Sequence, residues 1–318
     1  MPERDASRYS GVIYRNAYLI YNPNAGKLVK DSTLAGGVRA VLQSGGLTVQ
    51  MAPTMSAGHA TQLAAEAVKT GADLIVSMGG DGTVNEILNG MVRSSVPLAV
   101  IPGGTANVFC CETGIPRDAV KAARQLPHWV EARVALGRIH ASKAAERFFL
   151  LMAGAGLDAG IVQRVEPGIK RRLGKLAYWI AGLRTFGSGI SILKVRAEGR
   201  EFVTGFALTS RVANYGGDLT IATRASLFAD HFELVTFSGR STIPYGLYLA
   251  GAVVAYTTKL PGVQSTLTQR VELMPIDGDP VYLQIDGEAV GQLPATIDLV
   301  PAALTILVPP AAKKFRNG

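Results

Sequence analysis

The feature that most constrains the fold is a change of pattern near residue 130. Before this point, short apolar runs alternate with segments whose apolar residues recur every three or four positions. The runs lie at 17–22, 47–51, 73–78 and 96–101, and the helical patterns lie near 31–44, 57–70 and 83–93. Such alternation predicts βαβ units, which build a parallel sheet with helices on both faces.

After about Val130, strand-like runs follow one another with turns between them, which predicts a mostly antiparallel sandwich. The clearest runs are at 147–153, 190–197, 201–210, 232–237, 280–285 and 296–300. The sequence therefore predicts an α/β fold followed by an all-β one. A three-layer Rossmann-like domain spans 1–132 and an antiparallel β-sandwich domain spans 133–305, with a cleft between them. A C-terminal tail at 306–318 is compatible with packing back on the first domain.

Composition places the chain in the globular class, with 318 residues, 48% hydrophobic, 18% charged and a net charge of +8. The basic balance favours anionic partners without choosing among them. Cys110 and Cys111 are adjacent, which fits neither a disulfide framework nor a zinc site and favours a reducing cytoplasm.

The start of the chain shows no secretory signal pattern. The uncharged run at 243–258 is shorter than the roughly 20 residues of a spanning helix, so we expect a buried or interfacial helix there. The expected protein is soluble or peripheral to a membrane.

A glycine-rich turn, GGDGT at 79–83, lies between a predicted strand and a predicted helix. Thr83 and Glu86 form a capping-box pattern, which predicts that the helix starts there. Because a helix N-terminus attracts phosphate, and glycine allows close approach, the turn is suited to phosphate, with Asp81 placed to orient Mg²⁺ or its water. A plain βα turn explains the same glycines.

Two further turns favour a nucleotide site. YNPNAGK at 21–27 follows the first predicted strand, and PGGTANVF at 102–109 follows the fourth, where Gly103, Gly104 and Thr105 are expected to open another helix. In a parallel sheet, all three turns leave the same edge, where open α/β sheets bind ligands. Neither a P-loop nor a dinucleotide GxGxxG fingerprint is present.

The order NPNAGK, PTMSAGHA, GGDGTVNEILNG and IPGGTAN resembles the diacylglycerol kinase catalytic domain family, bacterial lipid kinases related to sphingosine and ceramide kinases. MAGAGLDA, KRRLGKLAYWIAGLR and VYLQIDGEAVGQLP later in the chain resemble that family too. The resemblance implies an ATP-dependent lipid kinase that uses Mg²⁺ and phosphorylates the hydroxyl of a diacylglycerol-like lipid. GGDGT alone is shared with NAD kinases and phosphofructokinases.

The resemblance also implies which residues contact ATP. They are Asn22, Pro23, Asn24, Ala25, Gly26, Thr54, Gly80, Asp81, Gly82, Thr83, Val84, Asn85, Glu86 and Thr105. Turn and cap chemistry would explain these residue types even without a nucleotide.

The catalytic candidates are Glu288, Asp286 and Asp81. Asp286-Gly287 alone is a hairpin signal. The resemblance implies that a carboxylate of this Asp-Gly-Glu lies across the interdomain cleft and accepts the proton of the lipid hydroxyl. The sequence does not separate the roles of Asp286 and Glu288.

A structural Mg²⁺ is implied at Leu227, Asp230 and Phe232, with one carboxylate and two carbonyl oxygens as donors. His231 stands where the family pattern has glycine. Val108 and Ala135 also replace acids of that pattern, which leaves Asp81 as the acid beside the nucleotide and puts metal use or catalysis in question.

Residues 169–187 combine an apolar helical face with a basic start formed by Lys170, Arg171, Arg172 and Lys175. This predicts a helix on an acidic membrane surface, and hence a cytoplasmic protein peripheral to the inner face of the membrane. A helix packed on the second domain fits the same pattern.

Other functions stay open from the sequence: a non-catalytic lipid-binding or regulatory homologue, a sphingoid-base kinase, or an NAD-type kinase. Nucleic-acid binding is disfavoured because no basic-aromatic platform or reading helix is found. A homodimer is neither required nor excluded.

Overall fold

The computed structural model describes residues 14–142, 145–156, 191–215, 219–238, 251, 256–276 and 280–312. The chain divides into two compact units: the first joins the chain up to Leu136 with the chain from Pro301 on, and the second spans Gly137–Val300. Both divisions fall inside long strands, β5 (Val130–Ala141) and β18 (Ala295–Val308). The predicted divisions at 132 and 305 fall within the same two strands, and no linker separates the units.

The first unit is built on a parallel sheet with the order β2-β1-β3-β4-β18. Its first four strands are β1 (Asn16–Tyr21), β2 (Thr48–Pro53), β3 (Leu74–Gly79) and β4 (Leu98–Pro102). Every residue of β3 and β4 is buried. Such unbroken apolar strands are expected where helices cover both faces of a parallel sheet.

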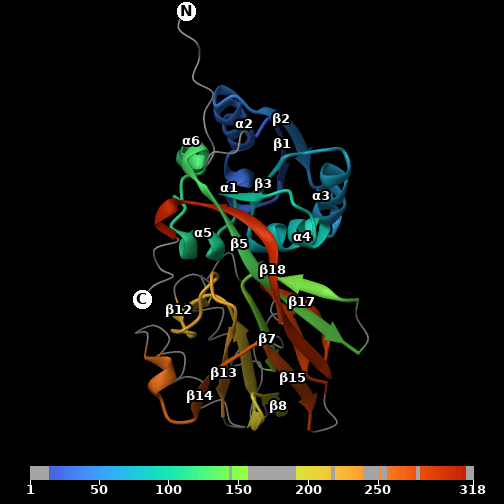
Figure 1. The fold of residues 1–318 in the computed structure, drawn as a ribbon, viewed down its shortest axis with the longest axis vertical. Helices are drawn as coiled ribbons and strands as arrows, with labels where there is room; N and C mark the ends of the chain where they lie inside the picture. The colour runs from blue at the N-terminus through green and yellow to red at the C-terminus, as the bar shows by residue number, and fades with distance from the viewer. Residues whose placement is uncertain are drawn as a thin grey trace, which may run out of the picture. The chain divides into compact units, whose positions relative to one another are not determined.

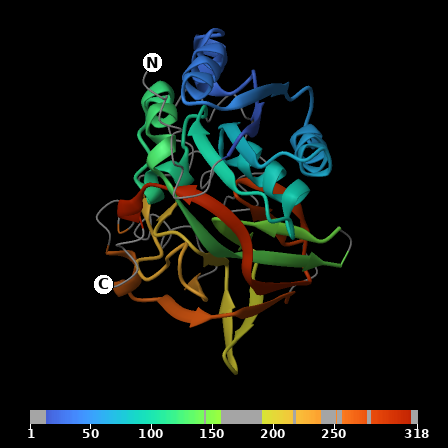
Figure 2. The same cartoon turned by 45° about the horizontal axis from the view of Figure 1, so that its top comes forward.

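The helices of the first unit are α1 (Gly26–Lys30), α2 (Leu34–Ser44), α3 (His59–Lys69), α4 (Asp81–Met91), α5 (Val108–Thr113) and α6 (Ala119–Gln125), followed by the 3₁₀ turn η1 (Leu126–His128). Helix α2 packs with α6, and α3 packs with α4, so that the two pairs flank the sheet (Figures 1 and 2). The predicted three-layer α/β domain is confirmed.

Two predicted helix starts are wrong. Helix α4 begins at Asp81 with Gly80 as N-cap and has no side-chain cap, so the Thr83–Glu86 capping box does not form. The side chain of Thr83 lies instead against Gly79, where an added Cβ would approach its Oγ1 to 2.4 Å. Helix α5 begins at Val108, because Asn107 before it takes a left-handed conformation with φ of 48°.

The second unit is built on antiparallel strands, which confirms the predicted sandwich. A six-stranded sheet has the order β14-β13-β10-β7-β16-β17, and the ten-stranded sheet that begins with β2-β1-β3-β4 continues through β18, β15 and β8 to β9, with β5 paired to β18 and β6 paired to β5. The strands new here are β6 (Arg147–Phe149), β7 (Met152–Gly156), β8 (Leu193–Ala197), β9 (Arg200–Thr204), β10 (Phe206–Ser210), β13 (Phe232–Phe237), β14 (Val263–Thr268), β15 (Arg270–Pro275), β16 (Tyr282–Ile285) and β17 (Glu288–Gln292). Short elements complete it: β11 (Asn214–Tyr215), β12 (Leu219–Thr220) and η2 (Thr257–Lys259).

The core of the second unit draws side chains from both of its sheets. Phe149 of β6 stacks on Phe232 of β13 with ring centroids 5.8 Å apart. Leu193, Leu273 and Leu283 belong to the same buried cluster. Burial of these apolar faces holds the two sheets together.

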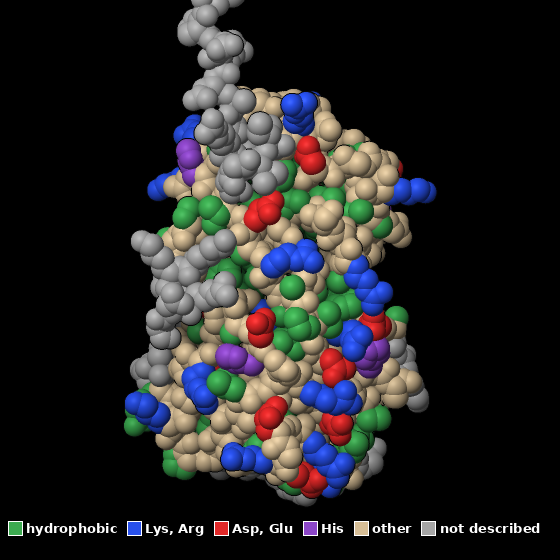
Figure 3. Space-filling view, viewed as in Figure 1, with side chains coloured by type: hydrophobic (Ala, Val, Ile, Leu, Met, Phe, Trp, Pro, Cys, Tyr) green, Lys and Arg blue, Asp and Glu red, His purple; other side chains and the backbone are tan. Residues whose placement is uncertain are grey.

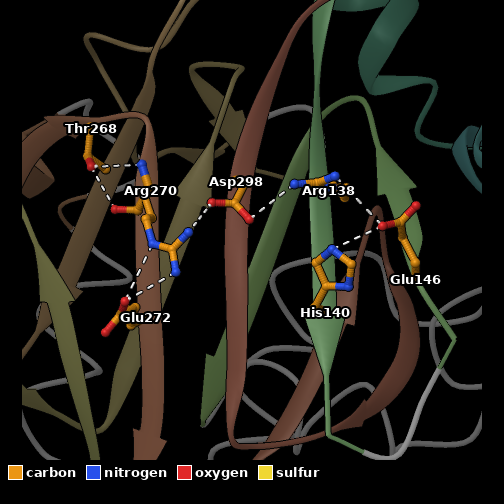
Figure 4. A network of polar contacts seen from close by, with 7 residues as sticks. All are labelled: Arg138, His140, Glu146, Thr268, Arg270, Glu272 and Asp298. Carbon is orange, nitrogen blue, oxygen red and sulfur yellow. Dashed lines mark hydrogen bonds and ion pairs between the residues drawn. The ribbon is translucent and has the colours of Figure 1, made fainter. Parts of the chain in front are cut away.

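A chain of ion pairs crosses an exposed face of the second unit (Figure 4). Arg270 pairs with Asp298 at 2.9 Å, Asp298 pairs with Arg138 at 3.5 Å, and Glu146 lies 3.0 Å from His140. The face of this unit seen in Figure 3 likewise mixes acidic and basic side chains. Exposed pairs of this kind each contribute at most about 1 kcal/mol, so they support the strand pairing that the core sets.

The predicted membrane helix at 169–187 and most of the apolar run at 243–258 lie outside the described residues. Within the described part of the chain, none of the helices has the length and apolar character needed to span a bilayer.

The contact between α3 and α4 makes a testable prediction. A Cβ at Gly90 of α4 would lie 2.1 Å from the carbonyl oxygen of Thr61 in α3, whereas a Cβ at the exposed Gly37 of α2 meets nothing within 4 Å. We expect Gly90→Ala to destabilise the protein by roughly 1–3 kcal/mol through overpacking. Gly37→Ala should be neutral or stabilising by up to about 1 kcal/mol. Urea unfolding of both variants measures this, and equal stability of the two would contradict the packing.

Candidate functional site

The turns singled out by the sequence meet at one edge of the parallel sheet. The N–H of Asn22, after β1, donates to the carbonyl of Met78 in β3 at 3.1 Å. The N–H of Thr54, after β2, donates to the carbonyl of Tyr21 at 2.9 Å. The N–H of Lys27 donates to the carbonyl of Gly103 at 2.9 Å. The carboxyl ends of all four strands are thus joined by backbone hydrogen bonds.

The two glycine pairs touch backbone to backbone. The carbonyl oxygen of Gly79 accepts hydrogen bonds from the N–H groups of Gly103 at 2.9 Å and Gly104 at 2.8 Å. A Cβ on Gly104 would lie 2.5 Å from the Cα of Gly80, closer than any side chain can come. Packing alone therefore requires glycine at 104.

Gly80 differs from its neighbours because it has room. A Cβ there would meet only the Cα of Gly104, at an ordinary 3.8 Å, and its φ of −92° suits any residue. Packing within the protein does not demand glycine at 80. The first turn of α4, which follows it, is where a helix presents N–H groups without intrahelical partners.

Asp81 spans from α4 to α5. Its carboxylate accepts hydrogen bonds from the N–H groups of Val108 at 3.1 Å and Phe109 at 3.3 Å, and thereby caps α5. An acid at a helix N-terminus stabilises the helix by about 0.3–1 kcal/mol.

The other residues implied as nucleotide contacts differ in what they expose. Thr54, Thr83, Val84 and Asn85 have buried side chains, while Pro23, Asn24 and Thr105 are exposed. Ala25 is also buried, and Asn22, Gly26 and Gly82 are partly exposed. The carboxylate of Glu86 accepts a hydrogen bond from the N–H of Ala60 at 3.0 Å, which ties α4 to the start of α3.

Asn107 was not among the sequence candidates, yet it shapes the fourth turn. Its side chain is buried; Oδ1 accepts from the N–H of Gly104 at 3.0 Å, and Nδ2 donates to the carbonyl of Gly104 at 2.8 Å. Asparagine tolerates the left-handed conformation found here. Its position after two glycines was the signal that could have found it.

The side chain of Lys27, in α1 after the first of these turns, is partly buried. Its ammonium donates to the carbonyl of Arg117, and burial lowers its pKa, with Cys110 and Asp118 acting in the opposite direction. Burial raises the pKa of the Cys110 thiol well above its usual range, which fits the predicted role of a small buried side chain.

In the second unit, the predicted Asp-Gly hairpin is confirmed. Asp286 and Gly287 have φ of 47° and 89° and join β16 to β17, as a two-residue turn with both angles positive requires. The carboxylate of Asp286 accepts three backbone hydrogen bonds, from Leu150, Leu151 and Met152, at 2.9–3.1 Å. Asp286 therefore anchors the bend between β6 and β7.

Glu288 is placed differently, as the first residue of β17. Its side chain is 39% exposed and lies 3.5 Å from Arg147 of β6. The sequence did not indicate that Arg147 would lie beside Glu288, because a charged residue at the start of a strand is common and carries no signal of its partner. The two carboxylates that the sequence could not separate thus have different surroundings: Asp286 holds backbone, and Glu288 is accessible beside a cation.

The residues implied as a structural metal site already have partners within the protein. The carbonyl of Leu227 accepts a hydrogen bond from Arg211, and the carbonyl of Asp230 accepts one from Gln269 at 2.8 Å. Phe232 lies in β13, in register with Thr268. Because the set has one carboxylate and a guanidinium lies against its Leu227 carbonyl, this donor set does not fit a Mg²⁺ ion.

Val108 and Ala135, which replace acids of the family pattern, are both buried, at 5% and 2% exposure. Asp81 is thus the acid that the first unit offers beside the glycine turns.

Comparison with known proteins shows what each part of the chain resembles. Residues 16–139 match the diacylglycerol kinase catalytic domain, and residues 152–308 match the YegS C-terminal NAD kinase beta sandwich-like domain. Together with curated relatives that are named diacylglycerol kinase, these matches show a lipid kinase.

Such relatives extend over most of the chain. A diacylglycerol kinase of Bacillus subtilis is 29% identical over 287 residues, which is 88% of this chain and 92% of that protein. One of Mycobacterium tuberculosis is 29% identical over 286 residues, with 86% and 89% covered.

Solved structures show the same fold. A crystal structure of a Bacillus anthracis diacylglycerol kinase superposes with a TM-score of 0.74 at 23% identity, covering 94% of this chain and 99% of that one. Another from the same organism gives a TM-score of 0.80 at 20% identity, with 98% and 100% covered.

The surroundings of Asp286 and Glu288 predict different effects on stability. Asp286→Asn keeps the left-handed turn but removes the charge that three N–H groups share, so we expect a loss on the order of 2 kcal/mol. Glu288→Gln should change stability by less than about 0.5 kcal/mol, because its ion pair is exposed. Urea unfolding of the two variants provides the comparison. A larger loss for Glu288→Gln than for Asp286→Asn would refute these assignments.

Proposed function

We propose that this lipid kinase transfers the γ-phosphate of ATP to the hydroxyl of a diacylglycerol-like lipid. ATP would bind to the first unit and the lipid to the second. The observation that carries the proposal is the set of glycine turns joined at the carboxyl edge of the parallel sheet, with Gly80 open in front of α4. The names of the relatives support diacylglycerol as the acceptor class.

The residues of the first unit suit a nucleotide phosphate. The N–H groups of the first turn of α4 and the partial positive charge of the helix end would bind the phosphates. Asp81 would accept hydrogen bonds from the water shell of Mg²⁺, whose charge, when bound, offsets that of the phosphates. The backbone contact between Gly79 and Gly104 holds these groups in place before any ligand arrives.

In the second unit, Glu288 is the better candidate for the base. A lipid hydroxyl is a weak nucleophile, and a carboxylate within reach accepts its proton as the oxygen bonds to phosphorus. Glu288 is partly exposed, and Arg147 lies 3.5 Å away, where it would orient the carboxylate. Asp286 would act by positioning the turn, since its oxygens already accept three N–H groups.

A lipid acceptor implies work at a bilayer surface. We propose a cytoplasmic enzyme that binds peripherally to the inner face of the membrane, through the basic amphipathic segment at 169–187. A homodimer stays a prediction that the sequence leaves open.

A second candidate is a regulatory homologue that binds lipid without turnover. The observation that favours it is the burial of Val108 and Ala135, because buried apolar side chains cannot join an acid-and-water network around a metal. Transfer to any lipid would exclude this candidate.

The test is transfer of label from γ-labelled ATP into mixed micelles that contain diacylglycerol, monoacylglycerol, phosphatidylglycerol or sphingosine in separate reactions. We expect label in diacylglycerol. Glu288→Gln should lower kcat by about 10²–10⁴-fold, the usual contribution of a general base.

Glu272→Gln is the matched control, since Glu272 is likewise a partly exposed carboxylate of the same unit, 3.3 Å from Arg270. It should retain wild-type activity and thermal stability. Absence of label from all four lipids would reject the proposed reaction, and full activity of Glu288→Gln would reject Glu288 as base.

A further inference from the structure

Arg211 is a charged side chain in the interior of the second unit. The residue follows β10 and is 0% exposed. Its backbone N–H donates to the carbonyl of Leu151 at 2.8 Å. A buried guanidinium is costly unless it is hydrogen-bonded or paired. Its partners should therefore explain why the fold keeps it.

Those partners are carbonyl oxygens of one loop. Nη2 of Arg211 donates to the carbonyl of Leu227, and Nη1 donates to the carbonyl of Ala229 at 3.3 Å. Burial lowers the pKa of Arg211 to about 10, and the charge of nearby Asp230 acts against this lowering. The side chain is thus a cation at neutral pH that donates to two carbonyl oxygens, while its buried Nε has no hydrogen-bond partner among the described residues.

Two backbone carbonyls with a nearby carboxylate are the type of oxygen donor that a hard divalent cation also takes. We propose that Arg211 is a built-in cation that takes the place of a structural Mg²⁺, so that the loop at 226–232 keeps its conformation without a metal. This inference concerns the loop and does not rest on the proposed reaction.

The two occupants exclude each other. Mg²⁺ requires about six oxygen ligands at roughly 2.1 Å, and an ion bound to the carbonyl of Leu227 would lie within a few ångströms of the guanidinium, whose like charge repels it. Asp230 would supply the charge of a metal site, but this residue is exposed. Its backbone carbonyl accepts a hydrogen bond from the side chain of Gln269 at 2.8 Å. The guanidinium, with several donors in one plane, can instead reach two carbonyls at once.

The loop also has a path to the hairpin that carries Asp286. Arg211 bonds through its backbone to Leu151, and the N–H of Leu151 donates to the carboxylate of Asp286 at 3.0 Å. The same arginine therefore joins the 226–232 loop to the bend that holds the Asp-Gly-Glu turn. The position of that turn should be independent of free divalent metal.

The first measurement is thermal unfolding of the full-length wild-type protein, without nucleotide, in EDTA and in millimolar Mg²⁺. We expect the same Tm in both. A rise of Tm with Mg²⁺ that Asp230→Asn abolishes would overturn the proposal, because it would place a metal at this loop.

The second measurement replaces the cation. Arg211→Ala removes it and should lower the Tm by on the order of 5 °C. Millimolar guanidinium chloride, far below denaturing concentrations, should restore part of that loss, whereas sodium chloride at equal ionic strength should not. An unchanged Tm in Arg211→Ala, or a deficit that guanidinium leaves in place, would contradict the assignment.

Arg211→Met and Arg211→Lys cover the case in which the alanine variant does not fold. Met fills a similar volume without donors, and Lys keeps the charge but lacks the planar fork. We expect Lys to retain more of the wild-type Tm than Met. If Met matches or exceeds Lys, the residue serves by volume and the proposal fails.

Discussion

The first unit depends on a close backbone contact between two glycine turns. The carbonyl of Gly79 accepts the N–H groups of both Gly103 and Gly104, and a side chain at 104 would collide with Gly80. This contact fixes the end of β3 against the end of β4 and sets where α4 and α5 begin. The proposed phosphate site is thus built from backbone that packing has already positioned.

Carboxylates that accept backbone N–H groups hold loops and helix ends in place in both units. Asp81 caps α5, Glu86 reaches the N–H of Ala60 at the start of α3, and Asp286 holds three N–H groups beside β7. In the second unit, Arg211 does the reverse, as a cation that satisfies carbonyl oxygens. Acidic residues in family motifs therefore need not all be catalytic. Glu288, partly exposed beside Arg147, is the carboxylate proposed as the base.

The strands and the two fold classes could be predicted because β3 and β4 are continuous apolar runs and the second unit alternates with short turns. The start of α4 was predicted wrongly, because Thr83 packs on Gly79, a contact that capping rules do not include. The anchoring role of Asp286 also escaped prediction, since its partners are N–H groups 134–136 residues earlier in the chain. A sequence pattern does not indicate which backbone groups a side chain will bind. The role of Arg211 could not be predicted for the same reason, because its partners are backbone carbonyls.

The most direct test of this account is the affinity for Mg·ATP of the Gly80→Ala variant, measured by calorimetry alongside its thermal unfolding. A Cβ at 80, the N-cap of α4, has room within the protein, and in the proposed site it would compete with the phosphates for that room. The account predicts an unchanged Tm and an affinity reduced about tenfold or more. Wild-type affinity in Gly80→Ala would contradict it, because the glycine turn would then not be where the phosphates bind.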